Sequence, residues 1–317
     1  MSPPASERAI RPPARSDVRA IVDLAIAVDR AEYGAPDFTE EDVLSDWDAP
    51  RFDPARDAWV AGGPGGRLSG YASVWERDPG RELTSTILVH PEDSATGVGE
   101  RLLAATEARA AERLREAGAA SARLATVVPS VNAARRALVR AAGYRHTRTY
   151  VRMDIDLTGR EVRSPEIPGI EIRPFRLGED DRALHEAMEE SFADHFRFQR
   201  RPHEEWMALR TKDPRFKPDL WFVAWDGDEP AGGVLGYDLG DICWIRELGV
   251  RPARRRRGLG RALLLRAFAA FQSRGRNKIC LGVDRDNAYD ATRLYERAGM
   301  VVGQEHEFWE KRIGAAP

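Results

Sequence analysis

The residues with the clearest chemical potential form one short stretch, in which Arg254–Arg257 directly precede Gly258-Leu259-Gly260 and an apolar run. The start of an α-helix leaves backbone N–H groups without partners and carries a partial positive charge. Glycines let an anion approach such a backbone, and arginines add fork-shaped charged donors. The combination fits a pyrophosphate. It is not a P-loop, because Gly-Lys-Ser/Thr is absent, nor a dinucleotide fingerprint, because Leu263 replaces the third glycine.

Three other interpretations of the four arginines stay open at this point: a solvated charge run, a nucleic-acid patch and a localisation signal. The chain carries a formal net charge of −2, so it is not a polyanion binder as a whole. No basic-aromatic repeat flanks the arginines, and they lie between an expected strand and an expected helix. Both features disfavour the nucleic-acid and localisation interpretations, so we expect no nucleic-acid partner.

Apolar periodicity predicts the elements that position this stretch. A strand should end just before the arginines, and the helix after them has apolar residues about one turn apart. An Asp-Gly-Asp turn between two upstream strands indicates a hairpin. The pattern predicts an α/β fold with a mixed sheet. The expected strands are 170–175, 220–226, 231–239, 242–250, 278–284 and 306–312, and the expected helices lie within 179–210, at 258–272 and at 287–298.

The chain repeats itself once, because several landmarks recur in the same order at nearly constant offsets. They are Ile10-Arg11-Pro12 with Ile172-Arg173-Pro174, Gly97 with Gly258, and Gly143 with Gly299. We therefore expect a duplicated domain, with an N-terminal copy at 1–157 and a C-terminal copy at 170–317. The polar segment 158–169, punctuated by proline and glycine, is the expected linker.

Composition sets the class of protein. The 317 residues are 42% apolar, enough for a sizeable core, and two domains are the usual expectation at this length. Cys243 and Cys280 lie in apolar runs and predict buried thiols in a reducing compartment, without metal-ligand spacing. The first residues lack the apolar core of a signal peptide, and no apolar run approaches the roughly 18 residues of a membrane span. We expect a soluble, cytoplasmic protein that needs neither a membrane nor a metal.

Two motifs together resemble those of the GCN5-related N-acetyltransferase (GNAT) family. Val250-Arg251-Pro252, then Arg255–Gly260 and an apolar helix, resemble its acetyl-CoA pyrophosphate loop, Arg/Gln-x-x-Gly-x-Gly/Ala. Residues 283–300 resemble its next motif, with an Asn, an Ala, Leu-Tyr-Glu, and a Gly before a hydrophobic residue. The resemblance covers 170–317 and, more weakly, 8–157. The tandem arrangement is similar to that of mycothiol synthase and related two-domain actinobacterial acetyltransferases.

The resemblance implies two tandem domains, each a mostly antiparallel twisted sheet flanked by helices. It implies transfer of an acetyl group from acetyl-CoA to a primary amine of a small molecule, by direct attack in a ternary complex. It also implies that a splayed strand offers backbone N–H groups near Leu248 and Val250 to the cofactor, and that Asn287 lies near the pantetheine arm. The full expected cofactor set is Leu248, Val250, Arg255, Arg256, Arg257, Gly258, Leu259, Gly260, Arg261 and Asn287.

The reaction needs a base, because an alkyl amine with a pKa near ~10.4 is mostly protonated at neutral pH, and a donor for the leaving thiolate. By resemblance, Glu247 is the expected base; the alternative is an ion pair with Arg246 or Arg173. Tyr295 is the expected proton donor, and the alternative is a packed tyrosine.

The segment 191–206 falls where the family has the lid over its acceptor site. The expected substrate contacts are Asp194, His195 and Phe196, with Tyr237 and Trp244 on neighbouring strands, although the same residues could cap a core.

The N-terminal copy has lost the residues that the chemistry requires. Ser94 and Thr96 stand at the positions of Arg255 and Arg257, and Asp93 at that of Arg254. Thr86 replaces Glu247 and Val139 replaces Tyr295, although Gly97-Val98-Gly99 and Asn132 persist. We expect this copy not to catalyse acetyl transfer. Transfer to a protein amine or from another acyl-CoA, and a non-catalytic acyl-CoA-binding protein, remain alternatives for the whole chain, which is expected to be a monomer or a homodimer.

Overall fold

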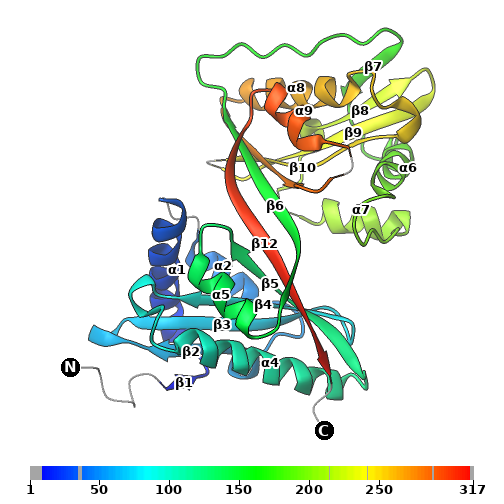
Figure 1. The fold of residues 1–317 in the computed structure, drawn as a ribbon. Coiled ribbons are helices and arrows are strands. Elements are labelled where there is room, and N and C mark those ends of the chain that lie inside the picture. Colours follow the sequence, from blue (N-terminus) through cyan, green and yellow to red (C-terminus); the bar gives the residue numbers. More distant parts are fainter. Residues whose placement is uncertain (1–8, 35–37, 214, 241, 288, 315–317) are drawn as a thin grey trace. The chain divides into compact units, whose positions relative to one another are not determined.

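A computed structural model describes residues 9–34, 38–213, 215–240, 242–287 and 289–314. The chain divides into two compact units (Figure 1). Unit 1 comprises Met1–Thr149 and Glu305–Pro317, and unit 2 comprises Tyr150–Gln304.

Unit 1 is an α/β unit whose sheet has the strand order β1-β2-β3-β4-β5-β12. Neighbouring strands are antiparallel except for β4 and β5, which are parallel. Helix α4 packs on one face of the sheet, and α1 and α2 pack on the other. Its elements are β1 Ile10–Arg11, α1 Val18–Tyr33, α2 Glu40–Trp47, α3 Pro54–Asp57, β2 Ala58–Gly62, β3 Leu68–Asp78, β4 Glu82–Val89, α4 Val98–Glu116, β5 Ser121–Pro129 and α5 Ala133–Ala141.

Unit 2 repeats this topology with the order β7-β8-β9-β10-β11-β6. Again one pair of neighbours, β10 and β11, is parallel and the others are antiparallel. The expected mixed, mostly antiparallel sheet is confirmed in both halves. The elements are β7 Ile170–Pro174, α6 Asp181–Phe192, α7 His203–Thr211, β8 Trp221–Asp226, β9 Glu229–Asp238, β10 Cys243–Val250, α8 Leu259–Gln272, β11 Lys278–Asp284 and α9 Ala291–Arg297.

The last strand of each sequence half joins the sheet formed by the other half. Strand β6 (Arg145–Asp156) pairs with β11 from Asp156↔Lys278 to Tyr150↔Asp284. Strand β12 (Val301–Gly314) pairs with β5 from His306↔Pro129 to Gly314↔Ser121. The units therefore differ from the contiguous ranges 1–157 and 170–317. Because the halves are duplicated, their last strands are equivalent. The local sequence therefore does not show which of the two equivalent sheet edges each strand joins.

The segment expected to be a linker, 158–169, belongs to unit 2. The Ser164 hydroxyl donates to the Ala262 carbonyl of α8 at 2.9 Å, and Val162 packs against the core beneath that helix. Ile167 forms an isolated antiparallel bridge with Ile170.

The unit 2 sheet is covered on both faces, because side chains alternate between them along each strand. Val234 of β9 packs with Phe268 and Phe271 of α8, whereas Leu235 and Tyr237 pack with residues of α6 and α7. Cys243 and Cys280 are buried free thiols, as expected. Burial raises the pKa of Cys243 to about 11, so this thiol stays protonated at neutral pH. Among the described residues, no helix combines the length and apolarity that a membrane crossing requires.

The exchange of last strands predicts which unit a core substitution in β12 destabilises. Trp309 of β12 is 4% exposed and packs in the unit 1 core, although it lies in the C-terminal half of the sequence. Trp309→Ala should destabilise unit 1 by about 3–5 kcal/mol, because it leaves a cavity there. Hydrogen–deuterium exchange should accelerate in β5 and not in β8 and β9. Val301→Ala, at a position that is 64% exposed, is the control and should change neither. Faster exchange confined to β8 and β9 would contradict the exchanged pairing.

Candidate functional site

The loop between β10 and α8 contains two residues with left-handed backbone conformation. A single 3₁₀ turn, Pro252–Arg254, leaves β10, and α8 then begins after Gly258. Gly258 has φ 80° and Arg256 has φ 62°, so two left-handed residues flank Arg257. A left-handed arginine is disfavoured by roughly 1–2 kcal/mol, and such alternation turns successive N–H groups toward one point. Within the described part of the chain, no side chain caps the start of α8. These N–H groups can therefore bind an anion.

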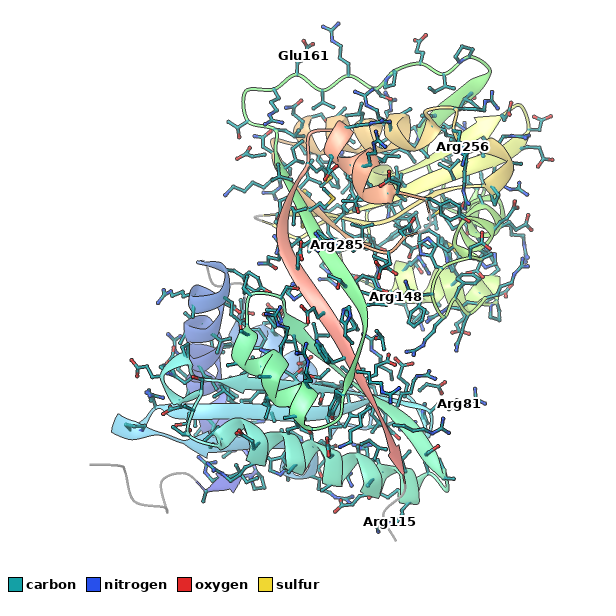
Figure 2. All side chains as sticks on the ribbon, in the orientation of Figure 1. Arg81, Arg115, Arg148, Glu161, Arg256 and Arg285 are labelled. Atoms are coloured by element: carbon teal, nitrogen blue, oxygen red, sulfur yellow. The ribbon has the colours of Figure 1, made fainter. Side chains whose placement is uncertain are left out.

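The four arginines have different roles in the structure. Arg254 and Arg257 both contact Asp226 at the end of β8, at 2.8 and 3.0 Å. Arg255 donates from Nε to the Val250 carbonyl and from Nη2 to the Ser191 carbonyl, each at 3.0 Å. Arg256, labelled in Figure 2, is exposed and has no ion pair or hydrogen bond with another described residue. Of the expected cofactor cations, Arg256 and the exposed Arg261 therefore keep their guanidinium groups available in this structure, whereas Arg255 and Arg257 are engaged within the protein.

Strands β10 and β11 part beside this loop. They pair only from Cys243↔Ile279 to Ile245↔Leu281, although β11 continues to Asp284 and β10 to Val250. The register of β10 against β9 shifts between Ile245 and Glu247, so a bulge at Arg246 turns the rest of β10 away.

The direction of the freed backbone groups follows from the next residue. The Arg251 N–H donates to the Ala231 carbonyl on the β9 side at 3.0 Å. Since successive N–H groups alternate in direction along a strand, those of Leu248 and Val250 face the opening between β10 and β11. The splay that the family resemblance implied is therefore present, and the N–H groups of Leu248 and Val250 point into it.

Gly260 allows the first turn of α8 to approach its neighbours. A Cβ at Gly260 would lie 3.0 Å from Leu294 Cδ1 of α9 and 3.7 Å from Val250 Cγ2. The glycine therefore serves helix packing as well as access to the backbone.

Glu247 forms an ion pair that the sequence did not indicate. Its Oε1 atom accepts from Arg210 Nη2 of α7 at 2.5 Å, and the side chains are 18% and 13% exposed. The Arg210 guanidinium lies 3.7 Å from the Trp206 ring centre and donates to the Trp206 carbonyl at 2.9 Å. The second carboxylate oxygen, Oε2, has no hydrogen bond or ion pair with the residues that the structure describes.

The two partners that the sequence suggested for Glu247 bind elsewhere. Arg246 contacts Asp213 at 4.0 Å, and Arg173 contacts Asp180 at 2.6 Å. Arg210 is 37 positions before Glu247 in the chain, and no spacing rule links a helix residue to a strand residue at that separation.

Tyr295 lies on α9 in the core on the α8 side of the sheet, with 8% of its surface exposed. Burial raises the pKa of Tyr295 to about 12, so the phenol keeps its proton throughout the neutral range. Its hydroxyl has no hydrogen-bond partner within the described part of the chain. It is therefore a buried, protonated donor.

The residues expected to contact substrate fall into two groups. Asp194, His195 and Phe196 follow the end of α6, where Asp194 accepts from the Tyr289 hydroxyl at 2.5 Å. Burial lowers the pKa of His195, so its neutral form is favoured. Tyr237 and Trp244 face each other across β9 and β10, on the face covered by α6 and α7.

Asn287, the residue expected near the pantetheine arm, serves the loop before α9. Its side-chain oxygen accepts from the Tyr289 N–H at 2.8 Å, in a local turn. The expected helix 287–298 is shorter in the structure and begins at Ala291; position 288 lies outside the described residues. Within the described ranges, no cluster of three or more His, Cys, Asp or Glu side chains could hold a metal ion.

Comparison with known proteins decides the family. Residues 182–300 match the model of the acetyltransferase (GNAT) family. A mycothiol acetyltransferase from Kineococcus radiotolerans is 33% identical over 315 residues, covering 95% of each chain. This chain belongs to the GNAT acetyltransferase family. It is an acyltransferase, and GNAT acetyltransferases use acetyl-CoA.

Solved structures agree with the tandem GNAT architecture. A GCN5-related N-acetyltransferase from Sphaerobacter thermophilus has a TM-score of 0.86 and 30% identity, covering 99% of this chain and 98% of that chain. A tandem GNAT protein from the clavulanic acid biosynthesis pathway has a TM-score of 0.69 at 17% identity, covering 98% of this chain and all of that chain. The second likeness supports the fold alone.

The corresponding loop of unit 1 keeps the left-handed glycine before its helix, but it lacks the second left-handed residue, and its ion pair with the hairpin has the opposite polarity. Gly97 has φ 75° before α4, as Gly258 does before α8. Buried Asp93 accepts from Arg67 at 2.5 Å, where unit 2 has Arg254 bound to Asp226. A cavity of about 790 Å³ lies between α1, α4 and α5, and its lining includes three glutamates and one arginine, Glu32, Glu100, Glu107 and Arg135. The absence of catalysis in this unit stays a prediction.

A double-mutant cycle tests the Arg210–Glu247 pair. Arg210→Met and Glu247→Gln should each destabilise the protein, and their coupling energy should reach about 1–3 kcal/mol, because the pair is largely removed from water. Urea denaturation of the four proteins gives this value. The exposed pair Arg182–Glu204, with side chains 75% and 76% exposed, is the matched control and should couple by less than about 0.5 kcal/mol. Equal coupling in the two cycles would mean that Glu247 is not held as described.

Proposed function

We propose that unit 2 transfers the acetyl group of acetyl-CoA to a primary amine of a small molecule, by direct attack in a ternary complex. The observation that carries the proposal is the parting of β10 and β11 beside an uncapped, curled loop at the start of α8. A thioester can enter between the strands while the loop binds its diphosphate. Buried free thiols fit a reducing compartment, and we propose a cytoplasmic location.

The residues of this site fit acetyl-CoA. The N–H groups of 256–260 are the proposed diphosphate donors, with positive charge added by Arg256 and Arg261. The N–H groups of Leu248 and Val250 face the gap in which the pantetheine arm and the thioester carbonyl would lie. Donors held in place before the reaction stabilise an oxyanion without reorganisation.

Glu247 is the proposed base. The amine arrives protonated, because its pKa of about 10.4 is above neutral pH, and it must lose a proton before it can attack. Arg210 holds one carboxylate oxygen of Glu247, and Oε2 is left to accept the proton directly or through a water molecule. The amine nitrogen then bonds to the thioester carbon and the C–S bond breaks. The second proton of the nitrogen passes to the departing thiolate, which leaves the amide and the free thiol of CoA.

Tyr295 is the proposed donor to the departing sulfur. Its pKa of about 12 lies above the value of roughly 8.5 for a thiol, so full transfer of the proton to the thiolate is uphill. A hydrogen bond from the phenol still stabilises the negative charge that develops on sulfur. Because the hydroxyl is buried, water screens this interaction little.

The acceptor is proposed at the level of a small-molecule amine. The half-buried and exposed residues after α6, including Asp194 and His195, offer charged and aromatic contacts for it. Relatives named mycothiol acetyltransferases make unacetylated mycothiol one member of the amine panel to test. Acetyl-CoA-dependent release of free thiol across amino sugars, polyamines, amino acids and this compound would identify the class. Tight acetyl-CoA binding with no turnover of any amine would favour a binding protein instead.

Gly260→Asp tests the diphosphate cradle. The carboxylate would lie beside the bound diphosphate, so affinity for acetyl-CoA should fall by about 100-fold or more through like-charge repulsion. Isothermal titration calorimetry measures the affinity. Gly260→Ala adds the same Cβ close to Leu294 without the charge, and it should weaken binding only about threefold. Unchanged affinity in the aspartate variant would remove the cradle from the mechanism.

Tyr295→Phe tests the donor. Turnover should fall about 10–100-fold, while the affinity for acetyl-CoA stays the same, because only the hydroxyl is lost. The raised pKa of Tyr295, about 12, keeps the phenol protonated well above pH 9, so the variant should lower the pH–rate profile without moving an alkaline limb near pH 8–9. Steady-state kinetics across pH give both results. Tyr144→Phe, at a buried tyrosine of unit 1, should leave turnover unaltered. A shifted alkaline limb in Tyr295→Phe would count against this assignment.

A further inference from the structure

Three segments of unit 2 meet at Arg255. Its Nε donates to the Val250 carbonyl, which faces the gap between β10 and β11, and its Nη2 donates to the Ser191 carbonyl in the last turn of α6. The guanidinium carbon also lies 3.8 Å from the ring centre of Tyr289, in the loop between β11 and α9. One side chain thus contacts the end of β10, the end of α6 and the loop before α9.

Tyr289 closes this arrangement on the far side. Its hydroxyl donates to Asp194 Oδ2 at 2.5 Å, so the residues directly after α6 are tied to the same loop. His195 is near enough for Arg255, Asp194 and Asp284 to influence its pKa, which burial lowers. Arg255, Tyr289 and Asp194, here called the Arg255 brace, therefore link the loop that carries the anion-binding turn to the segment proposed to contact the acceptor.

The contacts of Arg255 determine which of its properties matter. Both hydrogen bonds go to backbone carbonyls, and the last carbonyls of a helix lack partners within the helix. A guanidinium can satisfy two carbonyls and stack on a ring at once because its donors form a rigid planar fork, whereas a lysine ammonium cannot hold that geometry. Arg256, one residue further on, is exposed and has none of these contacts within the described residues.

We infer that Arg255 is a positioning residue that holds the segment after α6 against the cofactor loop, and that Tyr289 and Asp194 complete this brace. The two neighbouring arginines then have different roles. Arg256 contributes charge to diphosphate binding, and Arg255 sets the position of the acceptor-contacting segment. The predicted effect on KM rests on the proposed function. The predicted ordering of the segment after α6 can be tested without any acceptor.

Hydrogen–deuterium exchange of the full chain is the first measurement. Arg255→Ala and Tyr289→Phe should each speed amide exchange in residues 193–201 by about 3–30-fold, with and without acetyl-CoA. The first variant loses the bond to the Ser191 carbonyl, in the helix turn directly before this segment, and the second loses the bond to Asp194 within it. Arg256→Ala is the matched control and should leave exchange in 193–201 unchanged. Thermal melting shows whether each variant is folded. Tyr289→Phe keeps the aromatic ring and supplies a mild second variant if Arg255→Ala does not fold.

Acetyl-CoA titration should show the reverse pattern. Arg256→Ala should weaken binding of acetyl-CoA about 3–10-fold through the loss of one charge near the diphosphate, and Tyr289→Phe should not weaken it. Arg255→Lys should behave like Arg255→Ala in the exchange measurement, since charge alone does not restore the fork. Equal exchange in 193–201 for wild type, Arg255→Ala and Tyr289→Phe would overturn the brace.

The last measurement compares KM and kcat, with the amine that gives the highest turnover in the panel. Tyr289→Phe should raise the KM for this amine about 3–10-fold and change kcat less than twofold, which a general loss of stability would not produce. If no amine is turned over, the proposed function fails while the exchange result still decides the brace. If amines are turned over but KM is unaffected by Tyr289→Phe, the brace does not position the acceptor segment and the inference is wrong.

Discussion

After Ile245 and Leu281, β10 and β11 no longer share hydrogen bonds, and the rest of the site depends on this gap. A backbone N–H or C=O group that loses its partner in a sheet needs another one, from water, a side chain or a ligand. In the chain alone, Arg255 satisfies the Val250 carbonyl. The N–H groups of Leu248 and Val250 face the same gap, where a bound thioester and pantetheine would accept from them. The bulge at Arg246 is therefore the local irregularity on which the proposed chemistry of the site depends.

The arginine run illustrates how little a charged residue's type reveals about its role. Asp226 holds Arg254 and Arg257 from the neighbouring hairpin, and Arg255 bonds to two backbone carbonyls. The proposed anion site therefore depends mainly on the backbone of the loop, which has positive φ at Arg256 and Gly258. In this proposal, the guanidinium groups of Arg256 and Arg261 add positive charge to that backbone site. Unit 1 supports the distinction, because it keeps the glycine turn at Gly97 while its ion pair with the hairpin has the opposite polarity.

The duplicated halves keep one topology and divide their strands between the two units. Each sheet has one parallel pair at the same place, β4 with β5 and β10 with β11, and each is completed by the last strand of the other half. Neither half of the sequence therefore contains all the strands of one unit. A fold made in this way couples the stability of unit 1 to residues near the C-terminus, whatever its own catalytic competence.

The sequence by itself determined the features that depend on near neighbours in the chain. Periodicity located the strands and helices of the C-terminal half, except that α9 begins at Ala291, and the repeat located the two copies. The spacing of Gly258 and Gly260 before an apolar helix located the turn that is proposed to bind an anion. Contacts between distant segments were decided only by the tertiary structure. Arg210 rather than Arg246 or Arg173 pairs with Glu247, and Arg255 donates to the Ser191 carbonyl of α6. Strand β6 pairs in unit 2 and strand β12 in unit 1. Each of these depends on which surfaces meet once the sheet has formed, and equivalent residues or equivalent strands compete for every such contact until packing selects one.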